Sequence, residues 1–328
     1  MQVSEMSADD ARTVAEVVQL RNDAIKVDSP WEHPMTATVQ VGAMRHGWDG
    51  EPPRCFVGRQ DGRLVGYGEL SVSDWDNTHL AWLDVMVHPD CRRQGLGSDL
   101  LRQLMDEARR VGRTRAGTAG WESAACRGFA RAHGFERRSQ AINRRQYLSE
   151  VDPAELARLY DEAAGHATSY ELLRIPGRTP PELLDAVVEL TAAINDAPQD
   201  DLDVEDEVFT AERIRGYERA NEGRRTAAYR LLARHRGSGE LAGQTVVAVE
   251  RDRSEIGHQH DTSVVRAHRG HRLGLLLKLE MLRWLGEVEP QLRTLDTWNT
   301  ETNGPMVAVN ERLGYRVLGR ALQFQRDL

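Results

Sequence analysis

The spacing of apolar and polar positions predicts strands that alternate with helices along the whole chain. Short apolar runs bounded by turn residues are typical of buried strands, and apolar residues three or four positions apart are typical of one helix face. The predicted strands lie at residues 2–6, 55–59, 64–71, 79–87, 114–118 and 138–148, and then at 170–175, 226–233, 243–249, 260–266 and 293–297. The predicted helices lie at residues 7–20 with Ser7 as N-cap, and at 98–108, 123–132, 154–164, 181–194, 273–285 and 305–313. This alternation predicts an α/β fold built on a mixed sheet.

Residues 84–105 combine a strand, a basic turn and a helix. The apolar run Val85–Val87 is of buried-strand type, and Pro89 ends it. Glycines in the turn lack Cβ atoms, so a ligand can approach the backbone closely there. Free N–H groups at the start of the following helix, beside arginine side chains, form a site that suits phosphate. The candidate phosphate-binding residues are Arg92, Arg93, Gln94, Gly95, Leu96, Gly97 and Ser98.

The elements of the first half of the chain recur in the same order in the second half. Gly62–Gly66 resembles Gly239–Gly243, Asp84 matches Asp261, and Arg92 matches Arg269, each at a separation of 177 residues. Several matches in one order at nearly constant spacing indicate two copies of one domain. We therefore predict a first repeat at residues 1–148, a connecting segment at 149–168 and a second repeat at 169–328.

The second repeat contains its own form of the basic turn. Its candidate ligand-binding residues are Val264, Arg269, Gly270, His271, Arg272, Leu273, Gly274 and Leu275. Arg272 stands where the first repeat has a glycine, and a side chain there needs backbone dihedrals that it can tolerate. Gly270 supplies conformational freedom just before it. The alternative interpretation is a decayed turn that is retained only for packing.

The composition of the chain limits which binding partners and which cellular compartment we expect. The 328 residues carry a net charge of −8, which argues against nucleic acid as a partner because that partner requires a basic face. The three cysteines are far apart and form no metal-ligand spacing, which favours a reducing cytoplasm. We expect no signal peptide and no membrane-spanning segment. No feature of the sequence indicates an oligomer.

The two turns resemble the acyl-CoA-binding motif of the GNAT superfamily of acetyltransferases. That motif reads Gln/Arg-x-x-Gly-x-Gly/Ala after a strand, and Arg92, Gly95 and Gly97 meet it, whereas Arg269 and Gly274 meet it in part. The resemblance implies two tandem GNAT-like domains similar to those of mycothiol synthases. It also implies acetyl-CoA as co-substrate, no metal, and direct transfer of the acetyl group to an amine.

The resemblance further implies roles for individual residues. A backbone N–H on the strand before the motif, near Val87 and Val264, would stabilise the thioester oxyanion. The family pattern Asn-x-x-Ala-x-x-Leu-Tyr places a tyrosine near the leaving thiolate. The second repeat keeps the asparagine as Asn303 and has Asn310 in place of the tyrosine, whereas the first repeat has Ser123 and Ala130. We therefore expect the second repeat to be the catalytic one.

The candidate catalytic residues are Asp261, Asn303 and Asn310. Asp261 and its counterpart Asp84 are candidate general bases, and the alternative is that each is an ordinary strand residue. The family geometry places the acidic loop 200–207 at the acceptor site, where it would attract a cationic small-molecule amine, but a solvated run of charges is the alternative interpretation. Two alternative functions are a non-catalytic CoA-binding protein and a protein lysine acetyltransferase.

Overall fold

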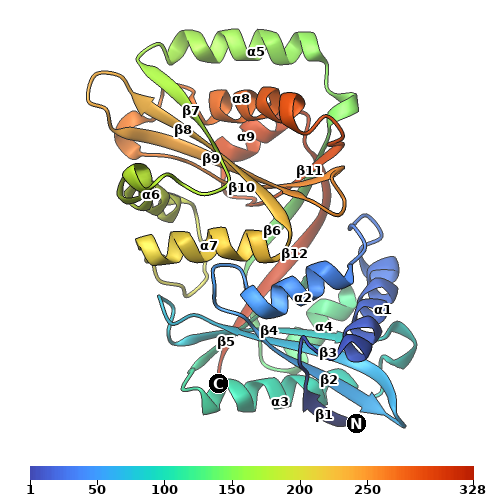
Figure 1. Cartoon of the computed structure of the whole chain (residues 1–328). Coiled ribbons are helices and arrows are strands. Elements are labelled where there is room, and N and C mark those ends of the chain that lie inside the picture. Colours follow the sequence, from blue (N-terminus) through green and yellow to red (C-terminus); the bar gives the residue numbers. More distant parts are fainter. The chain divides into compact units, whose positions relative to one another are not determined.

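The computed structural model describes residues 1–328, which fold into two compact units (Figure 1). The N-terminal unit comprises Met1–Ala141, Gln199–Glu207 and Gly319–Leu328. The C-terminal unit comprises Ile142–Pro198 and Val208–Leu318. The units follow the two repeats, apart from residues 199–207 and the last strand of each repeat. The predicted α/β fold with a mixed sheet is confirmed, because parallel and antiparallel strand pairs occur in both units.

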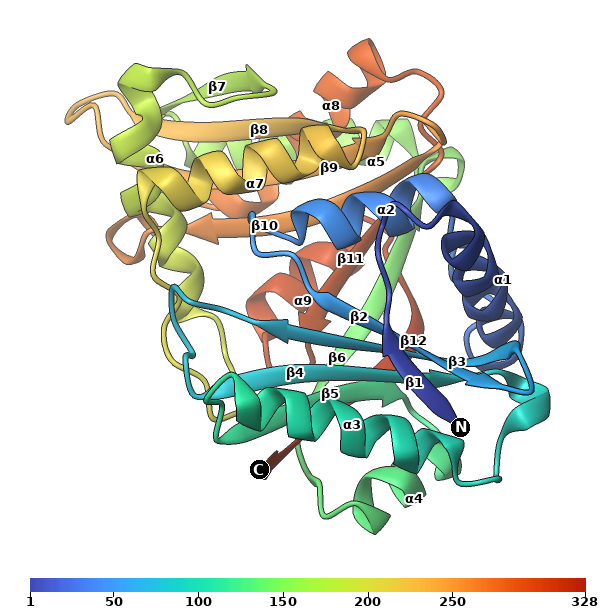
Figure 2. The same cartoon turned by 60° about the horizontal axis from the view of Figure 1, so that its bottom comes forward.

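The N-terminal unit is built on strands in the order β1-β2-β3-β4-β5-β12. The strands are β1 (Gln2–Glu5), β2 (Arg54–Gln60), β3 (Arg63–Val72), β4 (Leu80–Val87), β5 (Arg115–Trp121) and β12 (Arg316–Asp327), and the helices are α1 (Ala11–Asp28), α2 (Ala37–His46), α3 (Leu96–Arg110) and α4 (Ala124–Ala132). Figure 2 shows α3 and α4 on one face of this sheet and α1 and α2 on the other. Each face is apolar: Leu100, Leu104 and Ala130 belong to one core cluster, and Val17 and Leu20 to another.

The C-terminal unit repeats this arrangement with strands in the order β6-β11-β10-β9-β8-β7. The strands are β6 (Glu136–Tyr147), β7 (Tyr170–Pro176), β8 (Thr226–His235), β9 (Leu241–Glu250), β10 (Ile256–Val264) and β11 (Thr294–Thr300), and the helices are α5 (Pro153–His166), α6 (Leu184–Thr191), α7 (Ala211–Gly223), α8 (Leu273–Val288) and α9 (Gly304–Arg312). Short 3-10 turns lie at Pro89–Cys91, Leu148–Glu150, Pro181–Leu183, Ala192–Asp196 and Arg266–His268. Figure 1 shows α5 and α8 on one face of the sheet and α6 and α7 on the other.

The final strand of each repeat belongs to the sheet of the other unit. Strand β12 pairs antiparallel with β5, in a register that runs from Ala321 opposite Trp121 to Asp327 opposite Arg115. Its Leu322 and Phe324 are 0% and 4% exposed and complete the core beneath α3. Strand β6 lies beside β11 in the C-terminal unit. Each unit therefore needs both repeats to complete its sheet.

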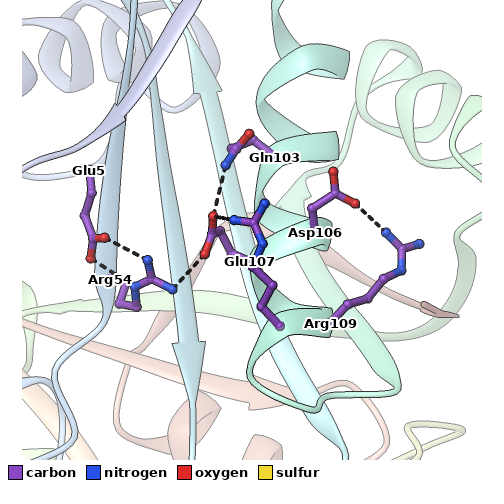
Figure 3. Close-up of polar contacts among 7 residues, drawn as sticks. Glu5, Arg54, Gln103, Asp106, Glu107 and Arg109 are labelled. Atoms are coloured by element: carbon purple, nitrogen blue, oxygen red, sulfur yellow. Dashed lines mark hydrogen bonds and ion pairs between the residues drawn. The ribbon is translucent and has the colours of Figure 1, made fainter.

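A polar network fixes α3 on the N-terminal sheet (Figure 3). Arg54 of β2 donates to Glu5 of β1 at 2.9 and 2.7 Å and to Glu107 of α3 at 3.1 Å. Gln103 donates to the other oxygen of Glu107 at 3.0 Å. The helix that begins at the basic turn is thus held at its far end by two strands, which keeps its first turn in a fixed place.

Three predicted details need correction. Asp10, and not Ser7, caps α1: its Oδ1 accepts from the Thr13 N–H at 3.0 Å, whereas Ser7 accepts from the Asp9 N–H before the helix begins. The helix predicted at 181–194 is a 3-10 turn, a short α-helix and a second 3-10 turn. Helices α2 and α7 and strand β12 were not predicted. No helix combines the length and the apolar character that crossing a membrane requires.

Candidate active site

In each unit two neighbouring parallel strands are paired where they begin and then separate. The pairing of β4 with β5 ends at Trp82 opposite Gly117, although β4 continues to Val87. The pairing of β10 with β11 ends at His258 opposite Asp296, although β10 continues to Val264. Beyond these points the facing backbone groups lack a sheet partner, so they are available to a ligand. Both openings lead directly to a basic turn.

Backbone alternation aims one peptide group of each strand into its opening. The His88 N–H donates to the Val65 carbonyl at 2.9 Å, and the Val265 N–H donates to the Ala242 carbonyl at 2.9 Å. Because successive residues of a strand alternate in direction, the N–H groups of Val87 and Val264 point to the other side, which is the opening. This is the placement that their predicted role as oxyanion donors requires, and the role itself stays a prediction.

Arg92 and Arg269 brace the two openings in the same way. The Arg92 Nε donates to the Val87 carbonyl at 3.2 Å, and its guanidinium binds both oxygens of Asp28 at 2.8 and 2.6 Å. The Arg269 Nε donates to the Val264 carbonyl at 3.1 Å, and its Nη2 binds Asp196 at 2.6 Å. Both arginines therefore connect a strand end to the end of a preceding helix, and their charge is largely neutralised. The predicted phosphate site is thus left with backbone N–H groups as its main donors.

The two turns have the same backbone shape despite their different sequences. In the first turn Arg93 and Gly95 have φ of 65° and 84°, and in the second Gly270 and Arg272 have φ of 88° and 56°. Each turn thus needs the left-handed region twice, and each supplies one glycine and one arginine, in opposite order. A non-glycine residue there loses about 1–2 kcal/mol. Gly270 does not relax the Arg272 position, which is itself left-handed.

The other predicted turn residues divide between core and surface. Leu96, Leu273 and Leu275 are buried, so only their backbone atoms are available. Ser98 shares a hydrogen bond of 2.9 Å with His133, and the His271 ring lies 5.5 Å from the Tyr170 ring. Gln94 and Arg93 are exposed. At Gly274 a Cβ would meet no atom within 4 Å, whereas at Gly97 it would lie 3.3 Å from the Phe129 ring.

Arg272 of the second turn forms an ion pair. Its guanidinium binds Glu162 of α5, which also binds Arg312 of α9 at 3.1 Å and Arg158 at 3.3 Å. Arg93, the exposed arginine of the first turn, forms no such ion pair. The left-handed arginine of the second turn is therefore paired with a carboxylate, and the left-handed arginine of the first turn is not.

A buried chain of polar side chains distinguishes the C-terminal unit. Lys278 of α8 donates to Asn310 Oδ1 at 2.6 Å, and Asn310 Nδ2 donates to Asn299 Oδ1 at 2.6 Å. Lys278 and Asn310 are 3% and 0% exposed, and burial lowers the pKa of Lys278 to about 7. The family pattern marks Asn310 in the sequence but neither Asn299 nor Lys278. A lysine inside the run Leu275–Leu279 was the one signal that it faces the core.

Asp261 lies at an irregularity of its strand. The register of β10 with β9 shifts between Gln259 and Thr262, so Asp261 lies within a bulge. The matched residue of the other unit, Asp84 on β4, lies in a regular part of its strand and pairs with Glu69. Burial raises the pKa of Asp261, and the neighbouring Arg230 opposes this rise. The Asp261 carboxylate forms no hydrogen bond or ion pair, which leaves it available to an incoming amine. In the N-terminal unit burial and the charge of Asp84 raise the pKa of Glu69.

Asn303 and the acidic loop have structural contacts. Asn303 caps α9 by accepting from the Met306 N–H at 3.4 Å, as Ser123 caps α4 by accepting from the Cys126 N–H at 3.0 Å. The structure favours this capping role, and a role in catalysis stays a prediction. In the loop, Asp200 binds Ser139, Asp203 binds Arg115, and Glu205 accepts from the Asn77 N–H. These three carboxylates hold the loop on the N-terminal unit while remaining exposed, so an acceptor-binding role for the loop stays a prediction.

No three side chains of His, Cys, Asp or Glu are grouped so that they would hold a metal ion.

No curated protein matches the sequence. Residues 17–135 match the family described as "Acetyltransferase (GNAT) family".

Two solved structures extend this similarity to the whole chain. A tandem GNAT protein from the clavulanic acid biosynthesis pathway is 28% identical, with a TM-score of 0.81 over 99% of this chain and 98% of its own. A GCN5-related N-acetyltransferase from Sphaerobacter thermophilus is 15% identical, with a TM-score of 0.70 over 99% of this chain and 95% of its own. With two openings, two turns and this similarity throughout, the chain resembles a tandem GNAT protein, and residues 17–135 match the GNAT family itself.

Proposed function

We propose that the protein transfers the acetyl group of acetyl-CoA to a primary amine of a small molecule, and that the C-terminal unit performs the transfer. The observation that carries this assignment is the hydrogen-bonded pair Asn310–Asn299 beside the opening between β10 and β11. The N-terminal unit has Ala130 and Gly120 at the same places, and neither offers a polar side chain.

The chemistry follows from the residues around this opening. The backbone N–H groups of the turn 269–275 hold the pyrophosphate of the co-substrate. The amine nitrogen attacks the thioester carbon, whose oxygen gains charge next to the Val264 N–H. Asp261 accepts the proton that the amine loses as the C–N bond forms. The C–S bond then breaks, and side-chain amides stabilise the departing thiolate, which takes a proton to become the free thiol.

The N-terminal unit is proposed to bind CoA without transferring its acyl group. Its turn has both glycines of the motif and an unpaired, exposed Arg93. At the positions of Asn310 and Asn299 its opening has Ala130 and Gly120, which cannot assist the thiolate. A CoA-binding protein without turnover is therefore the second candidate function for the whole chain.

Counting CoA sites and measuring thiol release together test these assignments. We expect calorimetry to find two CoA sites in the wild type and one in each of the variants Gly97→Trp and Gly274→Trp, because bulk in either turn blocks the phosphates. Acetyl-CoA and a panel of small amines and a lysine peptide should give thiol release that only Gly274→Trp abolishes. The Cβ of residue 274 points into open space, so this variant should fold normally.

Each contrary result has a definite meaning. Loss of thiol release in Gly97→Trp alone would move the chemistry to the N-terminal unit. Two bound CoA molecules with no release for any amine would favour the non-catalytic function. Release with the peptide alone would make the substrate a protein lysine. Unchanged CoA binding in both variants would exclude the turns as phosphate sites.

A further inference from the structure

We infer that Lys278 is a positioning residue, which fixes the direction of the chain Lys278–Asn310–Asn299 so that the Asn299 amide presents its NH2 group to the sulfur of the bound thioester. This inference rests on the proposed function of the C-terminal unit, and it adds Lys278 to the proposed site.

Lysine is an unusual choice at its position. The side chain is 3% exposed, its Nζ lies 4.8 Å from the centre of the buried Tyr315 ring, and no carboxylate pairs with it. Burying an amine that carries a charge is unfavourable unless hydrogen bonds compensate. Its one side-chain partner is the carbonyl oxygen of Asn310 at 2.6 Å. A residue so placed for packing alone would be apolar.

The donor and acceptor groups set the direction of the hydrogen bonds between Lys278, Asn310 and Asn299. Lys278 Nζ donates to Asn310 Oδ1, and as an ammonium, below its pKa of about 7, it can only donate, so Asn310 turns its oxygen to Lys278 and its NH2 group away. Asn310 Nδ2 lies 2.6 Å from Asn299, which must therefore accept with its own oxygen. It follows that the NH2 group of Asn299 points outward. Without the lysine, both amides could turn over and present an oxygen instead.

The outer end of the chain lies at the opening. Asn299 is on β11 beyond Asp296, the last residue paired with β10. It is half-buried, and its Nδ2 has no partner in the protein. Breaking the C–S bond puts negative charge on sulfur, and a fixed N–H donor in a site of low dielectric stabilises that charge. The amide only donates a hydrogen bond, so no proton needs to pass along the chain.

The N-terminal unit has none of the three polar residues Lys278, Asn310 and Asn299 at its matching positions. Lys278 and Leu101 are both the sixth residue of their helices, Asn310 and Ala130 both the seventh of theirs, and Asn299 and Gly120 both the sixth of their strands. Gly120 leaves no space for a side chain, since a Cβ there would lie 2.9 Å from Cys126 Sγ. All three polar groups are present in one unit and absent from the other, which indicates that they act together.

A double-mutant cycle tests the positioning role. We expect Lys278→Met to lower kcat by about 10- to 100-fold, the scale of losing one donor to the transition state, with little change in the KM for acetyl-CoA. In the Asn310→Ala background the same substitution should have no further effect, because Lys278 acts only through Asn310. Lys278→Arg, which also only donates, should restore much of the activity. Leu101→Met at the matched position of α3 is the control and should leave kcat unchanged.

A second variant and a second readout keep the inference testable if Lys278→Met folds poorly. Asn299→Asp keeps the acceptor for Asn310 but replaces the outer NH2 group by oxygen, so kcat should again fall about 100-fold. In asparagine-labelled protein, the side-chain NH2 signal of Asn310, which donates to Asn299 and is buried, should be protected in the wild type and lose protection in Lys278→Met.

The outcomes separate the inference from the proposed function. A kcat for Lys278→Met or Asn299→Asp equal to that of the wild type overturns the positioning role, and so does a full additional loss in the Asn310→Ala background. If the wild type turns over no amine while still binding CoA, the proposed function fails. In that case the Asn310 NH2 signal decides: unchanged protection in Lys278→Met overturns the positioning role, and lost protection supports it.

Discussion

At the residue scale, the buried Lys278 makes stability depend on pH in a definite direction. Burial lowers its pKa from the ordinary 10.5 to about 7 in the folded protein. Between these values the unfolded chain binds a proton that the folded protein does not, so the free energy of unfolding rises with pH in this interval.

Comparison with Lys278→Met isolates this contribution. Groups common to both proteins cancel in the difference between their free energies of unfolding. We expect the free energy of unfolding of the wild type, relative to that of the variant, to rise by about 1 kcal/mol per pH unit between pH 7.5 and 9.5. Below pH 6.5 this difference should change little with pH. Urea denaturation at several pH values measures this difference. A difference that is independent of pH would show that Lys278 keeps an ordinary pKa.

Asp261 gives a second prediction at this scale. Because burial raises the pKa of Asp261, the acid limb of the activity profile should lie above the pH at which an exposed aspartate titrates. Activity should fall as the pH drops through that limb, since a general base works only when deprotonated. Asp261→Asn should lower kcat at least 100-fold and remove the limb. Asp84→Asn, at the matched residue of the other repeat, should change kcat less than twofold. Equal losses in both variants would contradict catalysis in one unit.

Individual site residues were predictable from sequence only where the repeat or the family pattern marked them. Asp261 and Asn310 occupy marked positions, and the structure places both beside the same opening. Lys278 was not predictable in this role, because a lone lysine on a helix ordinarily extends into water. Only the packing of α8 against α9 and β11 shows that it faces Asn310. The capping role of Asn303 likewise depends on where α9 begins.

At the element scale, helix α5 places a carboxylate beside the second turn. Glu162 binds Arg272 of the turn and Arg312 of α9, so a phosphate entering the turn meets a carboxylate and an occupied arginine. Glu162→Gln should tighten CoA binding at the C-terminal site by about 3- to 10-fold, since it removes a like charge and frees both arginines. Calorimetry in Gly97→Trp protein, which retains only this site, measures the change.

Glu155→Gln supplies the matched control. Glu155 lies on the same helix and binds Arg158 but no residue of the turn. This variant should leave the affinity unchanged, and the effect of Glu162→Gln should shrink as the salt concentration rises. Weaker binding in Glu162→Gln would mean that Glu162 orders Arg272 for the phosphate instead of competing with it.

Most elements were predictable because their apolar periodicity is strong. The predicted hairpins at 55–71 and 226–249 are confirmed as β2–β3 and β8–β9, and Asp152 caps α5 as its sequence suggests. Helix α2 was missed because its buried residues include Gln40 and Gly42, which do not form an apolar stripe. Helix α7 was missed for a related reason, since Arg213, Glu218 and Asn221 are among its buried residues.

At the scale of the whole molecule, the exchange of final strands lay beyond the sequence. The repeat places one strand after α4 and another after α9, but a strand's own residues do not specify which of two similar sheet edges it joins. The consequence is that the repeats 1–148 and 169–328 are not separable folding units. A fragment limited to the first repeat would lack β12, whose Leu322 and Phe324 complete its core.

Phe324→Ala tests this dependence within the intact chain. Phe324 is 4% exposed in the core of the N-terminal unit, so replacing its ring by a methyl group should cost that unit about 3–5 kcal/mol. Hydrogen exchange should therefore accelerate mainly in β3, β4 and β5, and less in β9, β10 and β11. Val317→Ala on the same strand, where the side chain is 50% exposed, should leave exchange unchanged. If β12 instead served its own repeat, the faster exchange would appear in β10 and β11, because a lost core contact weakens first the sheet in which it was made.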